Sequence, residues 1–98
     1  MTFKVEKLPA ADEEISALEQ AQQELLKSEY AKIEQQGIEF VRVKSLQSQI
    51  FEIKSNELRS LFKYQAGRII VIGVVFVKKT QKTPQEKIKL AKKRLKDK

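Results

Sequence analysis

The sequence predicts an α+β fold, in which a small antiparallel β-sheet carries an N-terminal helix or helical hairpin and a C-terminal helix. Three observations predict it: a segment of helix-forming residues at 10–36, alternating apolar residues and a long apolar run between 51 and 79, and a helix start signal at 83–86. The chain has 98 residues, so we expect one domain over 1–98 with a core that needs no covalent staples.

The N-terminal third is expected to be mainly helical. A short opening strand is predicted over residues 3–8, and Pro9 ends it. From Ala10 to Gln36 the chain is rich in Ala, Glu, Gln, Leu and Lys, which favour a helix. The segment forms either one long helix or two antiparallel helices, and in the second case we place the break near Gln20–Gln23. Gly37 suits the position just after a helix end.

The following residues show a period of two, which is typical of strands. Phe51 and Ile53 alternate with polar residues and predict a half-buried strand. In the next strand, Arg59 and Lys63 are expected on one face and the apolar residues on the other. These apolar residues are Leu58, Phe62 and Tyr64.

The pairing of the last two strands decides what faces Arg59. We expect a three-residue hairpin loop at Gln65–Gly67, followed by a strand that begins at Arg68. If Tyr64 pairs with Arg68, Arg59 lies opposite Gly73. A glycine within a β-branched run marks the close approach of a ligand or backbone, or a bulge. Arg59 therefore stands over an open patch of sheet, or is an ordinary solvated arginine beside a bulge.

A cationic loop and a helix start signal follow the apolar run. The strand is expected to end near Lys79. Thr83 is predicted to cap the final helix, with Pro84 at its first position and Glu86 completing a capping box. The helix has a narrow apolar stripe, which consists of Ile88, Ala91 and Leu95.

The net charge of +7 is unevenly distributed. Up to Glu39 the chain holds four lysines against nine acidic residues, whereas after Glu39 it holds sixteen Lys and Arg against four acidic residues. This asymmetry indicates either a polyanionic partner for the C-terminal part or a soluble protein with a basic surface.

Composition and hydropathy exclude several kinds of site. The chain has no Cys and no His, which excludes disulfides, thiolate zinc sites and imidazole catalysis. Catalysis would have to come from Lys, Arg, Tyr, carboxylates or backbone groups. No secretory signal is visible, and the run Ile69–Val77 is too short to span a bilayer as a helix, so a cytoplasmic location is expected.

Strand parity groups several cations on one face of the predicted sheet. Lys54 points away from the apolar side of its strand, as Arg59 does. Lys78 and Lys79 point to opposite faces, and the expected register places Lys79 on the Arg59 face. The predicted cluster is Lys54, Arg59 and Lys79, with Lys78 and Lys82 at its rim.

Three segments, 50–54, 57–59 and 76–84, resemble the RelE/HigB-like superfamily of type II toxin–antitoxin toxins, most closely its phage-related HigB-type branch. The most specific match is the Phe-Val-Lys-Lys-Thr-x-Lys-Thr-Pro motif at Phe76–Pro84. The resemblance implies a RelE-like fold and a ribosome-dependent mRNA endoribonuclease that needs no metal or cofactor. It also implies silencing by a cognate antitoxin, a helix-turn-helix protein encoded nearby, with no membrane partner.

The resemblance also implies roles for individual residues. Lys54 assists activation of the ribose 2′-OH, Arg59 holds the scissile phosphate and Lys79 lies near the leaving group. Such chemistry needs a proton acceptor, a proton donor and charge stabilisation, and the 2′-OH makes RNA the substrate. Further RNA contacts are expected from basic side chains nearby, which are Lys63, Arg68, Lys78 and Lys82.

Two alternatives stay open at this point. The chain could be a toxin relative that inhibits a protein target such as gyrase without cleaving RNA. It could instead be an inactive nucleic-acid-binding module of phage origin, since family members often carry a His or Tyr near the last helix and this chain has neither after Tyr64.

Overall fold

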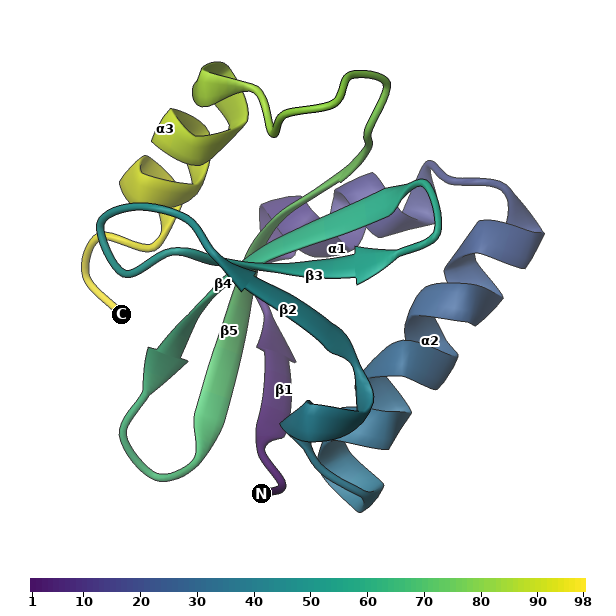
Figure 1. Ribbon diagram of the computed structural model, residues 1–98, viewed down its shortest axis with the longest axis vertical. Helices are drawn as coiled ribbons and strands as arrows, with labels where there is room; N and C mark the ends of the chain where they lie inside the picture. Colours follow the sequence, from purple (N-terminus) through teal and green to yellow (C-terminus); the bar gives the residue numbers. More distant parts are fainter.

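The computed structural model describes residues 1–98 as five strands, three α-helices and one 3₁₀ turn. The strands are β1 (Lys4–Lys7), β2 (Arg42–Ser45), β3 (Phe51–Ser55), β4 (Leu58–Gln65) and β5 (Ile69–Val77). The helices are α1 (Pro9–Ser16), α2 (Gln20–Gln35) and α3 (Gln85–Arg94), and the 3₁₀ turn is η1 (Ile38–Phe40). The strands form one sheet in the order β1–β5–β4–β3–β2 (Figure 1). The predicted α+β class is confirmed, with one parallel pair, β1 with β5, added to the antiparallel strands.

The helical segment forms two helices instead of one, as the second predicted alternative has it, but they do not pack as an antiparallel pair. The break covers residues 17–19, slightly earlier than the predicted one. The Gln22 side chain accepts a hydrogen bond from the Glu19 N–H at 3.1 Å, which helps to start α2 after the break. Gly37 follows the end of α2 with a φ of 138°, a value that residues with a Cβ rarely adopt.

Helices cover both faces of the sheet and create two separate cores. The pair α1 and α2 covers one face, and α3 covers the other (Figure 1). The first core includes Leu26, Ile33, Ile53, Leu58, Phe62 and Ile72. The second includes Leu61, Val74, Phe76, Ile88, Ala91 and Leu95, so the predicted stripe of the last helix is confirmed. None of the three helices has the length and apolar character that crossing a membrane requires.

The edge strand β2 and the turn η1 were not predicted. The sequence of β2 is Arg-Val-Lys-Ser, and all four residues are exposed, so it shows no buried apolar alternation. It becomes a strand because it pairs with β3, with Arg42 opposite Lys54. Pairing with β3, and not local propensity, therefore selects this strand.

The predicted register of the last hairpin is wrong. Tyr64 pairs with Ile70, because the loop includes Arg68, whose φ is 57°. A shift in the ladder then leaves Gly73 as an extra residue in β5, and Arg59 pairs with Phe76 instead of Gly73. The expectation of an open patch of sheet beneath Arg59 is thereby overturned. The alternative is correct in its bulge at the glycine and wrong about Arg59, whose side chain is only 13% exposed and lies away from the bulge.

The bulge at Gly73 makes room for α3. A Cβ atom at this position would lie 2.7 Å from the Leu95 Cγ, closer than real side chains approach. Leu95 is almost completely buried, so it has little space to move away. Glycine is therefore required here by the close approach of the last helix.

The edge of β5 beyond Ile72 has no neighbouring strand and is closed by two side chains. The Glu14 carboxylate of α1 accepts a hydrogen bond from the Val75 N–H at 2.9 Å, and Arg94 of α3 donates to the Gly73 carbonyl oxygen at 2.9 Å. Arg94 Nη1 also lies 3.1 Å from both Glu14 carboxylate oxygens. This clamp satisfies the strand edge and joins the helices of opposite faces.

We predict that Gly73→Ala lowers the free energy of unfolding by about 1–3 kcal/mol, because the new methyl group clashes with Leu95. Leu95→Ala alone should cost about 2–5 kcal/mol by leaving a cavity. In the double variant the methyl group occupies part of that cavity, so urea denaturation should show a loss smaller than the sum of the two. Additive losses would contradict the proposed contact.

A second prediction concerns Tyr30, whose hydroxyl is 2.6 Å from the Ser60 hydroxyl in the first core. Burial raises the pKa of Tyr30 above its ordinary value of 10.0. Near neutral pH, Tyr30→Phe should lower the free energy of unfolding by about 1–2 kcal/mol, since it leaves the buried Ser60 hydroxyl without this hydrogen-bond partner.

This difference should shrink as the pH rises above about 10. There the unfolded wild-type chain releases the Tyr30 proton while the folded chain retains it. The free energy of unfolding of the wild type therefore falls by up to about 1.4 kcal/mol per pH unit. Chemical denaturation of both proteins between pH 8 and 11 measures the effect. A constant difference across this range would show that Tyr30 is not held neutral by burial.

Candidate functional site

A concave pocket of about 530 Å³ lies at the end of the sheet where β2 begins and β3 ends. Its walls come from α2, η1, the first residue of β2 and the β3–β4 hairpin, elements that meet on the right of Figure 1. Four cationic side chains line it, against the single carboxylate of Glu29. The cations are Lys32, Arg42, Lys54 and Arg59.

Three of these cations form a row across neighbouring strands. Arg42 lies directly opposite Lys54, and Lys54 lies directly opposite Arg59, so the three side chains share one face of the sheet. The structure thus brings the predicted pair Lys54 and Arg59 together. No carboxylate lies within ion-pair distance of Arg42 or Lys54, so both charges are available to an anionic ligand.

Arg59 is held in a fixed orientation by its own hairpin. Its Nη1 donates hydrogen bonds to the carbonyl oxygens of Asn56 at 2.6 Å and Leu58 at 2.8 Å. The side chain is only 13% exposed, and its Nη2 makes no hydrogen bond to the protein. The guanidinium is therefore preorganised, with one nitrogen free to meet a ligand.

A buried carboxylate, Glu52, lies behind Arg59. Glu52 is completely buried, and its Oε1 is 3.9 Å from the Arg59 Nε. Neither of these two atoms has a hydrogen-bond partner, so the contact is an ion pair without hydrogen bonding. The other oxygen of Glu52 accepts a hydrogen bond from the Thr83 hydroxyl, which ties the last loop to β3.

This contact overturns the predicted role of Thr83. The first helical residue of α3 is Gln85, and Pro84 is its N-cap, without a side-chain capping bond. The Pro84 carbonyl oxygen accepts hydrogen bonds from the N–H groups of Lys87 and Ile88. The hydroxyl of Thr83 does not cap the helix because it is already bonded to the buried Glu52.

The β3–β4 turn joins three parts of the site. The Glu57 carbonyl oxygen accepts a hydrogen bond from the Lys78 N–H at 2.8 Å. The Glu57 carboxylate accepts one from the Gln22 side chain of α2 at 2.9 Å, and this bond lowers the pKa of Glu57. The turn therefore holds the start of the last loop close to Arg59 and to α2.

The argument that selected Lys79 by parity is wrong. The bulge at Gly73 reverses the alternation, so Phe76 shares the face of Arg59, and continued alternation would point to Lys78. The strand in fact ends at Val77, and Lys79 is exposed in the following loop. The catalytic role of Lys79 stays a prediction.

The remaining predicted RNA contacts are spread along the molecule. Lys63 shares the face of Arg59 near the middle of β4, and Lys82 is exposed in the loop before α3. Arg68 lies in the loop at the opposite end of β4, about 20 Å from Arg59 along the strand. The structure thus groups Lys54, Arg59 and the start of the last loop, but not Arg68.

Sequence reasoning missed Lys32 and Arg42 as members of the pocket. Lys32 reaches it from α2, where it pairs with Glu29 at 3.1 Å. Glu29 in turn accepts a hydrogen bond from the Ser55 hydroxyl at 3.2 Å. The only sequence signal for Arg42 is that it is the first basic residue after Glu39, where the charge changes sign.

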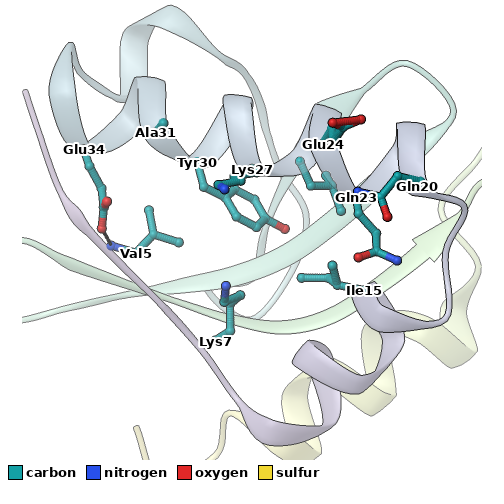
Figure 2. Close-up of a pocket in the computed structure, with 11 residues that line it drawn as sticks. Val5, Lys7, Ile15, Gln20, Gln23, Glu24, Lys27, Tyr30, Ala31 and Glu34 are labelled. Atoms are coloured by element: carbon teal, nitrogen blue, oxygen red, sulfur yellow. Dashed lines mark hydrogen bonds between the residues drawn. The ribbon is translucent and has the colours of Figure 1, made fainter.

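A second groove, of about 590 Å³, lies between β1, α1 and α2 (Figure 2). There the Glu34 carboxylate accepts a hydrogen bond from the Val5 N–H at 2.9 Å, which covers part of the open edge of β1. Two lysines and two glutamates line this groove, so it has no net charge to attract a polyanion. They are Lys7, Lys27, Glu24 and Glu34.

We predict that Thr83→Val lowers the free energy of unfolding by about 1.5–3 kcal/mol, because the buried Glu52 carboxylate loses its only hydrogen bond. Thr83→Ser keeps the hydroxyl and should cost less than about 1 kcal/mol. Urea denaturation measures the loss, and amide exchange should show faster opening of residues 78–84 in the valine variant alone. Equal effects of the two substitutions would contradict this role of the hydroxyl.

The chain matches one known protein family over most of its length. Residues 13–96 match the model of the family described as phage derived protein Gp49-like (DUF891). A search of the curated proteins finds no match.

Two solved structures share the fold at low sequence identity. One is a chain of the toxin–antitoxin complex RelBE2 from Mycobacterium tuberculosis, with 11% identity, a TM-score of 0.61, and coverage of 80% of this chain and 100% of that one. The other is a chain of the archaeal RelE–RelB complex from Pyrococcus horikoshii OT3, with 14% identity, a TM-score of 0.59, and coverage of 79% and 96%. The expected RelE-like fold is thus confirmed, and the family match over most of the chain shows that this protein belongs to the phage-derived Gp49-like family.

Proposed function

We propose that this protein is the toxin of a toxin–antitoxin system and that it cleaves mRNA on the ribosome. The observation that carries the proposal is the cationic pocket, in which Arg42 and Lys54 have no ion-pair partner and form a row with a preorganised Arg59. The family and the fold support it, because two structures of similar fold come from toxin–antitoxin complexes.

The proposed reaction is an internal transfer of the phosphate to the ribose. The 2′-oxygen forms a bond to the adjacent phosphorus, the bond from phosphorus to the 5′-oxygen breaks, and a 2′,3′-cyclic phosphate results. The 2′-OH loses a proton and the departing 5′-oxygen gains one. Negative charge accumulates on the phosphate oxygens, so neighbouring cations stabilise the transition state more than the ground state.

We assign these tasks to two residues of the pocket and to one lysine of the loop beside it. Arg59 has a free Nη2 to hold the scissile phosphate while its Nη1 stays on the turn carbonyls. Lys54, which lies directly opposite Arg59, is proposed to assist activation of the 2′-OH. Lys79, in the exposed loop that begins beside the turn, is proposed to stabilise the leaving group. An antitoxin would silence the protein by covering this pocket.

Induction in growing cells followed by mapping of mRNA 5′ ends tests the proposal. Lys54→Ala should reduce cleavage at least about 100-fold, because charge stabilisation and proton transfer each contribute factors of this size. Lys27→Ala, at an exposed lysine outside the pocket, is the matched control and should cleave normally. Comparing mRNA cleavage by Lys78→Ala and Lys79→Ala shows which of these two lysines the reaction needs.

Arg59 needs a more careful substitution, because Arg59→Ala would leave Glu52 buried without a nearby cation. Arg59→Lys keeps the charge and removes the fork of donors, so it should fold and still lose most activity. Toxicity with intact mRNA and altered DNA topology would contradict the proposal and favour a protein target. Normal growth on induction of the wild-type protein would also contradict it and indicate an inactive module.

A further inference from the structure

One aromatic residue, Phe40, is left outside both cores. Its side chain belongs to the wall of the cationic pocket, and the residue is 57% exposed. The other six aromatic residues are buried or half-buried. Phe3, Phe51, Phe62 and Tyr64 pack against one another, and Phe76 lies beneath Lys87. Phe40 therefore takes no part in the packing of either core.

The backbone holds Phe40 firmly in this exposed position. The N–H of Phe40 donates to the Gly37 carbonyl oxygen, and that of Val41 donates to the Ile38 carbonyl oxygen. Val41 is buried in the first core, and Ile38 packs against it. A ring between two such anchors is presented to the pocket by a rigid segment rather than by a mobile loop tip.

Phe40 and Arg42 are separated only by Val41, which has extended backbone angles and a side chain buried in the first core. Both line the pocket, about 6.6 Å apart along the backbone. An aromatic face and a guanidinium with no ion-pair partner are thus neighbours at the mouth of a cationic pocket.

We propose that Phe40 is a stacking platform for one base of a single-stranded RNA, whose adjoining phosphates are held by Arg42 and Lys54. Single-stranded RNA is recognised by stacking of splayed bases on aromatic side chains beside cations that follow the backbone. This inference rests on the proposed function, because it assigns a nucleotide subsite to the same pocket.

The pocket favours a nucleotide over a protein segment. Only three of its ten lining residues are apolar, and of these Val41 is buried and Leu25 half-buried. A protein partner needs a contiguous interface of several hundred Å² with an apolar centre. A base needs one aromatic face and a phosphate needs one or two cations, and the pocket supplies both.

The test uses the full chain and a fluorescently labelled single-stranded oligoribonucleotide with 2′-O-methyl groups, which cannot be cleaved by 2′-OH attack. Phe40→Ala and Phe40→Leu should each weaken binding about 5- to 100-fold, the range for loss of one stacked base. Phe40→Trp should bind like the wild type. Val43→Ala, which trims another exposed apolar residue outside the pocket, is the matched control and should change binding less than about 2-fold.

Two readouts separate stacking from a structural effect. The chain has no other tryptophan, so the fluorescence of Phe40→Trp reports on this position alone and should be quenched by RNA. An abasic oligomer with the same sugar–phosphate backbone should cause no quenching and should bind the wild type and Phe40→Ala equally. The slope of the logarithm of the binding constant against the logarithm of the salt concentration should be unchanged in Phe40→Ala. In Arg42→Ala its magnitude should fall by about 0.7, since only this variant loses a phosphate contact.

The outcomes distinguish this inference from the function on which it rests. If RNA binds the wild type, Lys54→Ala loses it and Phe40→Ala behaves like Val43→Ala, the stacking inference fails while the proposed function stands. Equal binding by Phe40→Leu and the wild type would also overturn stacking, because leucine offers apolar area without an aromatic face. If the wild type binds no RNA even at low salt, the stacking inference fails, and the mapping of mRNA 5′ ends in cells decides the proposed function separately.

Discussion

The extra residue at Gly73 in β5 is the constraint on which the rest of the structure depends. It shifts the ladder so that Arg59 faces Phe76, and it leaves the space into which Leu95 of α3 packs. Beyond the bulge the strand edge is closed from both sides of the sheet, by Glu14 of α1 and Arg94 of α3. One irregular position therefore fixes the register of the functional face and docks the last helix.

A buried charge couples this framework to the pocket. Glu52 offsets part of the charge of Arg59 and, through Thr83, ties down the loop that leads into α3. Arg42 and Lys54 have no such counter-charge. Besides Lys32, which pairs with Glu29, the pocket thus contains one cation held rigidly by the protein and two whose charge is available to a ligand, an arrangement suited to a phosphate backbone.

The parts of the fold that were predictable are those encoded by near neighbours in the chain. The alternation in β3 and β4 and the stripe of α3 follow from periodicity, and Lys54 and Arg59 meet because they flank one short turn. The strand β2 was missed because it is exposed at the sheet edge and has no apolar pattern. The register was missed because one inserted residue reverses every later assignment of side chains to faces.

The sequence by itself determined the fold class, the apolar stripe of the last helix and the concentration of positive charge in the second part of the chain. It did so because burial patterns and charge asymmetry are local properties of the chain. Only the tertiary structure decided that Lys32, Phe40 and Arg42 join the pocket and that Thr83 binds Glu52 instead of capping a helix. These contacts join residues distant in sequence, and they depend on how α2, the sheet and the last loop pack together.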